Sequence, residues 1–307
     1  MEQRWSNVVI VLFWLATMTW LVVEKVLPGL QQGEPPNIRS VYAAADREPQ
    51  VGWKVSWNQQ DIGWALSNMR RISSGMTEVH SQVHLEQIPL DQVVPALLRP
   101  QVRKLFGQID AESRLEIDPL NRLAGFRSVI QVPGLPEPLI IEGAPDNGRL
   151  KLHAEGANIP WLNDWTIPAD SLFRDELSPQ MTMPGLRVGQ TWTAPLCNPF
   201  SISHSLMEVL QASVEGHELI MWNGTPVDTL LVVYRGDPGS AFGASRIPRG
   251  KLWVDRDGEV LRQEVSLFNS HVAFERMNEK ESLETARTAL RLDPAAGNET
   301  PPQDDEN

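Results

Sequence analysis

Apolar and polar residues alternate one by one along residues 77–86. One side of this stretch carries Thr77, Val79, Ser81, Val83 and Leu85. The other side carries only polar residues, which are Glu78, His80, Gln82, His84 and Glu86. A period of two is typical of a β-strand with one buried face. The stretch therefore predicts a half-buried strand.

Shorter runs of β-strand character recur over most of the chain between residues 50 and 280. They are Trp53–Trp57, Ile62–Ile72, Leu123–Val132, Leu139–Glu142, Leu150–Ala154, Leu206–Val214, Leu219–Trp222, Thr229–Arg235, Lys251–Val254 and Val260–Phe268. Turn sequences separate many of them, namely 146–148, Glu215-Gly216, Asn223-Gly224 and Asp257-Gly258. Such spacing favours antiparallel neighbours. We expect a mainly β fold, with one curved antiparallel sheet or half-barrel and one or two short helices.

Two segments have helical rather than strand character. Leu90–Phe106 places apolar residues at helical spacing, although Pro95 and Pro100 should kink or divide this helix. A second, more charged candidate runs from about Glu279 to Arg291.

The amino terminus predicts a membrane anchor. Residues 5–23 contain no charge and are nearly all apolar, with Trp5 and Trp20 near the two ends. About 20 such residues span a bilayer as a helix, and indoles favour the interface. A cleaved signal peptide is the alternative, but the small residues Ala43–Ala45 lie too far from the apolar run for a cleavage site.

This pattern divides the chain into four parts. We expect an anchor over 1–25, a spacer over 26–49, a β-rich domain over 50–280, and a charged helix end with an acidic tail over 281–307. The short segment before the anchor favours a single-pass protein of the bacterial inner membrane, with its carboxy-terminal domain in the periplasm.

Charge narrows the possible partners. The 307-residue chain has a formal net charge of −12. Nucleic acid binding requires a basic surface to neutralise phosphates, so nucleic acid is excluded as a partner. Anionic lipid headgroups are disfavoured for the same reason.

The sequence offers few reactive groups, and we assign no catalytic residue, metal ligand or cofactor. His80 and His84 point the same way on the predicted strand but lie about 13 Å apart, too far to share one ion. We expect two exposed histidines on the solvent face. Cys197 stands between Pro195 and Pro199, a poor start for the helix that would activate a thiol.

The stretch Asp255-Arg-Asp-Gly258, followed by Glu264, matches part of a calcium loop. The first position of that loop would be Trp253, which has no oxygen ligand, and strands flank the stretch where helices are needed. We therefore expect a β-hairpin with Asp257-Gly258 as a two-residue turn, and Trp253 on the apolar face of the sheet.

Tryptophans are the strongest candidates for a binding function. Large indoles on a sheet are usually core, but they can also line an apolar cavity for a lipid-like ligand. The candidate ligand-binding residues are Trp53, Trp57, Trp64, Trp192, Trp222 and Trp253.

Two stretches resemble known exported bacterial domains. Residues 57–65 (Trp57-Asn-Gln-Gln-Asp-Ile-Gly-Trp-Ala65) look like the opening of β-rich domains that precede transglutaminase-like cores. Residues 186–192, followed by 252–262, are similar to the course of LolA/LolB-type periplasmic half-barrels. The resemblance implies a sheet wrapped around a hydrophobic interior, and it carries over no functional residue.

Taken together, these features predict a non-catalytic, membrane-anchored binding or scaffold protein outside the cytoplasm. Its partner would be a hydrophobic ligand in a Trp-lined cavity or a neighbouring envelope protein. An accessory subunit of a transporter or secretion complex remains open, as does a hydrolase that uses carboxylates which the sequence does not single out.

Overall fold

Over the described residues, the fold is a single sheet of fourteen antiparallel strands. The computed structural model describes residues 13–20, 50–72, 75–89, 106–119, 123–131, 137–147, 149–156, 165–168, 179–197, 207–236, 248–267 and 270–292. The first eight strands are β1 Gln50–Trp57, β2 Gln60–Arg71, β3 Thr77–Pro89, β4 Phe106–Ile117, β5 Leu123–Gln131, β6 Leu139–Asp146, β7 Arg149–Glu155 and β8 Trp165–Pro168. The other six are β9 Thr191–Cys197, β10 Met207–Trp222, β11 Thr225–Gly236, β12 Pro248–Val254, β13 Val260–Leu267 and β14 Ser270–Arg276.

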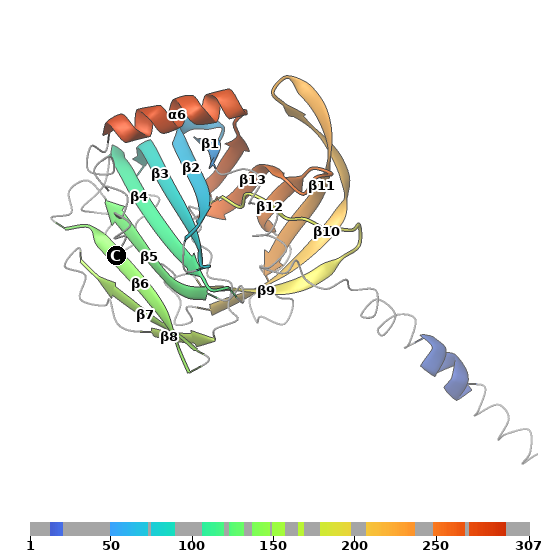
Figure 1. Ribbon diagram of the computed structural model, residues 1–307. Coiled ribbons are helices and arrows are strands. Elements are labelled where there is room, and N and C mark those ends of the chain that lie inside the picture. Colours follow the sequence, from blue (N-terminus) through green and yellow to red (C-terminus); the bar gives the residue numbers. More distant parts are fainter. Residues whose placement is uncertain are drawn as a thin grey trace, which may run out of the picture.

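Strands that follow each other in sequence are neighbours in the sheet, except β8 and β9, which form its two edges. The order is β8-β7-β6-β5-β4-β3-β2-β1-β14-β13-β12-β11-β10-β9, so the first and last strands, β1 and β14, pair in the middle. The sheet is strongly curved, with β4 to β8 on one side and β10 to β12 on the other (Figure 1). Among the described residues no ladder closes the two edges into a barrel.

A helix at the carboxy-terminal end of the described chain packs on the middle of the sheet. Helix α6, Glu279–Leu292, contacts β1 and β2. The Gly52 amide donates to Ser282 Oγ over 3.1 Å, and Lys54 Nζ lies 2.7 Å from Glu281 Oε1. This helix confirms the charged segment predicted at 279–291, and it spans the expected domain boundary at residue 280.

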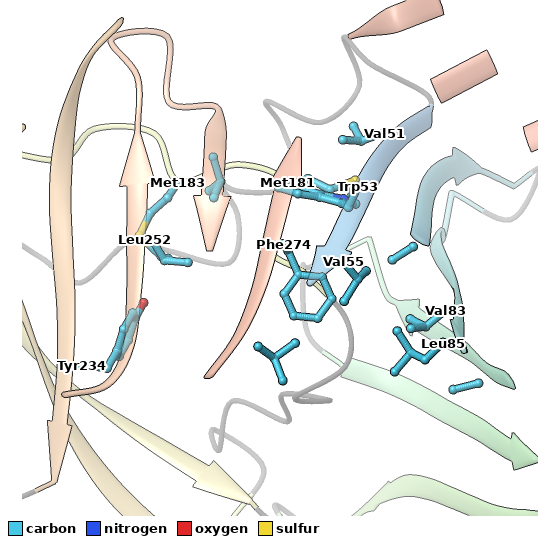
Figure 2. Packing of buried hydrophobic residues seen from close by; sticks show 14 of the residues in the cluster. Val51, Trp53, Val55, Val83, Leu85, Met181, Met183, Tyr234, Leu252 and Phe274 are labelled. Carbon is cyan, nitrogen blue, oxygen red and sulfur yellow. The ribbon is translucent and has the colours of Figure 1, made fainter. Parts of the chain in front are cut away.

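One face of the sheet carries the hydrophobic core, and we call it the inner face. On β1 it presents Val51, Trp53, Val55 and Trp57, all buried. The buried cluster continues across the sheet on both sides of β1, as far as β6 on one side and β9 on the other. Figure 2 shows several of these side chains. The face of β1 that carries Gly52 and Lys54, on which α6 lies, is the outer face.

Most predicted strands are present, but one helix end, four strands and one turn differ from the prediction. Phe106 begins β4 and does not end a helix, while residues 90–105 of that predicted helix lie outside the described residues. Four strands were missed, which are β4, β8, β9 and β14. Glu215-Gly216 is not a turn, because the register shifts there by a β-bulge and β10 runs through to Trp222.

The hairpin predicted at residues 255–258 is present, but its loop is longer than two residues. Asp255–Glu259 joins β12 to β13. Asp255 Oδ1 accepts hydrogen bonds from the amides of Asp257 and Glu259, at 3.0 and 2.8 Å. Gly258 has a φ of +84°, and a Cβ there would lie 2.7 Å from Pro184 Cα. An aspartate that bonds its own loop in this way stabilises the turn.

Part of the predicted anchor is helical. Residues 13–20 form a helix, and the rest of the 5–23 run lies outside the described residues. Within the part of the chain that is described, no helix has both the length and the apolar character needed to cross a bilayer.

Candidate functional site

The inner face contains a polar row inside its apolar lining. Ser67, Ser81, Ser113 and Ser128 stand in register on the neighbouring strands β2 to β5. Three strand spacings of about 4.8 Å give the row a length of about 14 Å. Ser67, Ser81 and Ser128 are buried, and Ser113 is half-buried. The row is thus a line of hydroxyl groups within the core.

The serines form two hydrogen-bonded pairs. Ser67 Oγ lies 3.3 Å from Ser81 Oγ, and Ser113 Oγ lies 2.8 Å from Ser128 Oγ. Each hydroxyl has one proton to donate. In the Ser67–Ser81 pair one proton bridges the two oxygens, so the second proton is available to an acceptor placed beside the row.

Apolar side chains flank the serine row on both sides. Toward one end of the strands lie Met69, Val79, Leu115 and Phe126, and toward the other lie Ala65, Val83, Ala111 and Ile130. All eight belong to the inner-face cluster or pack against it. The polar row is therefore a narrow band between two apolar rows.

Two indole N–H groups of the inner face have no hydrogen-bond partner. Trp53 and Trp57 are buried on β1, and their Nε1 atoms are inaccessible and unpaired. A buried donor without an acceptor costs roughly 1–3 kcal/mol. Trp53 stands one inner-face position from the level of the serine row, because Val51 pairs with Ser67 and Trp53 with Ala65. Trp53 thus holds a donor that lacks an acceptor close to the hydroxyl row, whereas Trp57 lies six residues along β1 from Val51, about 20 Å from the level of the row.

A short strap, residues 179–183, lies on the inner face near one end of β13 and β14. Arg276 is buried, and its Nη1 donates to the carbonyl of Met181 over 3.0 Å while Nη2 lies 3.5 Å from Glu259. The amide of Val260 also donates to the Met181 carbonyl. Met181 and Met183 join the buried cluster from this strap (Figure 2).

The six candidate tryptophans do not gather around one site. Trp53, Trp57 and Trp192 belong to the inner-face cluster, and Trp192 packs edge-on against Tyr234. Trp64 and Trp253 stand on the outer face, so the expectation that Trp253 joins the apolar face is wrong. Trp222 lies near the tip of β10, where its Nε1 donates to the carbonyl of Arg276.

The two histidines of β3 share one face as predicted, but they are not free surface groups. His84 is buried, stacks on Trp64, and its ring nitrogens lie 2.6 Å from Asp110 Oδ1 and 3.2 Å from Glu86 Oε1. Burial alone would lower the pKa of His84, but the two carboxylates outweigh burial and raise it.

His80, four residues before His84 on β3, makes the same kind of contact with a carboxylate. Its Nε2 lies 2.8 Å from Glu112 Oε1, and this bond lowers the pKa of the Glu112 carboxyl. The outer face of β3 and β4 therefore holds two separate histidine–carboxylate pairs. In the described part of the chain, no three His, Cys, Asp or Glu residues are arranged to hold a metal ion.

Beyond the bulge at residue 215, β10 and β11 form an arm, residues 215–229, that extends past the rest of the sheet (Figure 1). Asp228 Oδ2 accepts a hydrogen bond from Arg256 of the 255–259 loop, and this contact, together with His217, lowers the pKa of Asp228. Leu219 and Met221 on the arm are 73% and 62% exposed. The arm therefore presents two large apolar side chains to solvent.

Comparison with known proteins gives structural similarity alone. No family model matches the chain, and no curated protein matches it. A β-barrel-like protein of the domain of unknown function DUF1849 from Brucella abortus superimposes with a TM-score of 0.45 and 8% identity, over 74% of this chain and 94% of that chain. A DUF1089 family protein from Pseudomonas aeruginosa gives a TM-score of 0.33 and 14% identity, over 64% and 87%. The resemblance to LolA/LolB carriers and to transglutaminase-linked domains therefore stays a prediction.

Proposed function

We propose that this protein binds an apolar, lipid-like molecule on its inner face, as a non-catalytic binding protein of the bacterial envelope. The observation that carries the proposal is the serine row of β2–β5, which lies between two apolar rows, with the unpaired indole N–H group of Trp53 one inner-face position from its level. Binding sites for small molecules combine such an apolar lining with a few convergent polar groups.

The location in the envelope rests on sequence. The charge-free run at residues 5–23 supports a membrane anchor, and the half-barrel resemblance of residues 186–192 and 252–262 supports a domain in the periplasm. A lipid-binding domain tethered to the inner membrane would stay close to its source of ligand.

Co-purification tests the proposal. The full chain is extracted from membranes in a mild detergent, and the organic extract of the purified protein is analysed by mass spectrometry. We expect a discrete apolar molecule in stoichiometric amount. Ala111→Leu on the inner face of β4 should reduce it, whereas Glu112→Leu on the outer face should not. A folded, pure protein without any such molecule contradicts the proposal.

The arm supports a second candidate, in which the protein is an accessory subunit or scaffold of an envelope complex. Leu219 and Met221 are exposed on one face of a projecting hairpin, where a partner could cover them. Crosslinking in intact membranes tests this function. A specific adduct should disappear in the Leu219→Ser, Met221→Ser double variant and persist in Glu218→Ser, and an adduct that persists in both contradicts it.

A further inference from the structure

We propose that the inner face selects ligands that carry an uncharged hydrogen-bond acceptor, such as an ester or amide carbonyl, between two apolar parts, over ligands with an ionised phosphate or carboxylate. This inference rests on the proposed function and names its ligand class. Three properties of the inner face support it, which are the chemistry of its donors, the state of its buried cation and the order of its rows.

Near the serine row, the donors of the described side chains that lack an acceptor are neutral. They are the indole N–H group of Trp53 and the second hydroxyl proton of the Ser67–Ser81 pair. A carbonyl oxygen accepts one or two such bonds and carries no net charge, so these donors are sufficient to satisfy it. An ionised group would need a counter-ion as well, because burying a charge without one is far more costly.

The buried cation of the inner face is already compensated. Among the described side chains, Arg276 is the one buried basic group on this face. It donates to the carbonyls of Met181 and Val260, lies 3.5 Å from a Glu259 oxygen, and stands 5.9 Å from the Trp53 ring. An anionic ligand would have to displace Glu259 and release the strap, so Arg276 offers it no vacant charge.

The order of the rows places the acceptor inside the ligand rather than at its end. The serines lie between the row from Met69 to Phe126 and the row from Ala65 to Ile130. A molecule that crosses all three rows meets apolar, polar and then apolar side chains. An ester or amide with a hydrocarbon part on each side matches that sequence, whereas a fatty acid or a phospholipid has its polar group at one end.

Direct binding to three probes of similar length tests the inference. Native mass spectrometry of the delipidated full chain measures octyl decanoate, nonadecane and stearate. We expect octyl decanoate to bind at least about tenfold more tightly than the other two, which corresponds to one good hydrogen bond. The Ser67→Ala, Ser81→Ala double variant should lose this advantage and keep its affinity for nonadecane. Ser56→Ala, on the outer face of β1, should behave like the unchanged protein.

The outcomes separate the inference from the function on which it rests. If none of the three probes binds to the folded protein, the proposed function fails. If stearate binds as tightly as octyl decanoate, the inner face binds lipids but the selection for a neutral internal acceptor is wrong. If the double variant keeps the ester advantage, with an unchanged unfolding temperature, the serine row is not the recognition element and the inference is overturned.

Discussion

Gly52 of β1 and Ser282 of α6 are in direct contact, although 230 positions separate them in the sequence. The Gly52 amide donates to Ser282 Oγ over 3.1 Å, and the Gly52 carbonyl accepts from the amide of Met277 over 2.8 Å. A Cβ at Gly52 would lie 2.9 Å from both Met277 Sδ and Ser282 Oγ, and 3.0 Å from Ser282 Cα. The helix can therefore approach the sheet this closely only because residue 52 has no side chain.

Gly52→Ala should displace α6 and destabilise the protein by about 1–3 kcal/mol, as overpacking usually does. Chemical denaturation of the full chain in mild detergent measures the change. Gly125→Ala is the matched control, because a Cβ there meets nothing closer than 3.6 Å. Equal stability of the two variants would show that α6 is not held by this contact.

Arg276→Met should destabilise the protein by about 3 kcal/mol, because it removes the hydrogen bonds of a buried guanidinium to two carbonyls and its ion pair with Glu259. The denaturation midpoint reports the loss. Arg256→Met removes an ion pair to Asp228 from a side chain that is 82% exposed, so it should leave the midpoint within error. Similar effects for the two variants would contradict the role given to Arg276.

The Ser67–Ser81 pair can be tested by a double-mutant cycle. Ser67→Ala alone leaves the buried Ser81 hydroxyl without its partner and should cost about 1–3 kcal/mol. The Ser67→Ala, Ser81→Ala double variant removes both groups and should be no less stable than the single variant. Additive losses measured by thermal unfolding would mean that the two hydroxyls are not coupled.

Asp255→Ala should destabilise the 255–259 loop by about 1 kcal/mol, since it removes the acceptor of two backbone amides. Asp255→Asn keeps an oxygen at that place and should cost less, because burial already raises the pKa of the Asp255 carboxyl and disfavours its charge. Calcium should not change the unfolding temperature of either protein. A calcium-dependent rise that Asp255→Ala abolishes would restore the metal-loop interpretation.

The His84 cluster predicts a pH-dependent stability. The pKa of His84 in the folded protein is raised above the model-peptide value of 6.5, so its stabilising effect is fully present below about pH 6.5 and is lost as the pH rises through the folded pKa. The difference in unfolding free energy between the unchanged protein and His84→Gln should therefore be larger at pH 5.5 than at pH 9. His271→Gln is the control, because its ring faces a serine hydroxyl rather than a carboxylate. A difference that grows toward pH 9 would reverse the sign of this argument.

Alternation along the chain was enough to predict where strands such as β3 run and which side chains share a face. The strand β4 was missed although the same alternation marks it, with Ile109, Ala111, Leu115 and Ile117 on the inward side, because helical spacing assigns its first residue to the preceding predicted helix. The bulge at Glu215-Gly216 resembled a turn, because glycine next to a polar residue is common to both.

The serine row shows why the candidate site was missed. Each serine by itself is an ordinary polar residue in a strand, and Ser81 was even placed on the apolar side of β3. The row exists only because Ser67, Ser113 and Ser128 come into register with Ser81. A shift of one residue in the register of any of these strands would move its serine to the other face. The tryptophans were a stronger signal in the sequence, but the sheet distributes them over both faces.

The sequence by itself determined the class of fold, the carboxy-terminal helix and most strands, because these depend on local period, turn chemistry and charge. Only the tertiary structure decided that β1 pairs with β14, that α6 rests on Gly52, and that four serines align within an apolar face. Those features depend on strand register and on contacts between residues far apart in the chain, and no local pattern encodes them. The proposed ligand site belongs entirely to this second group.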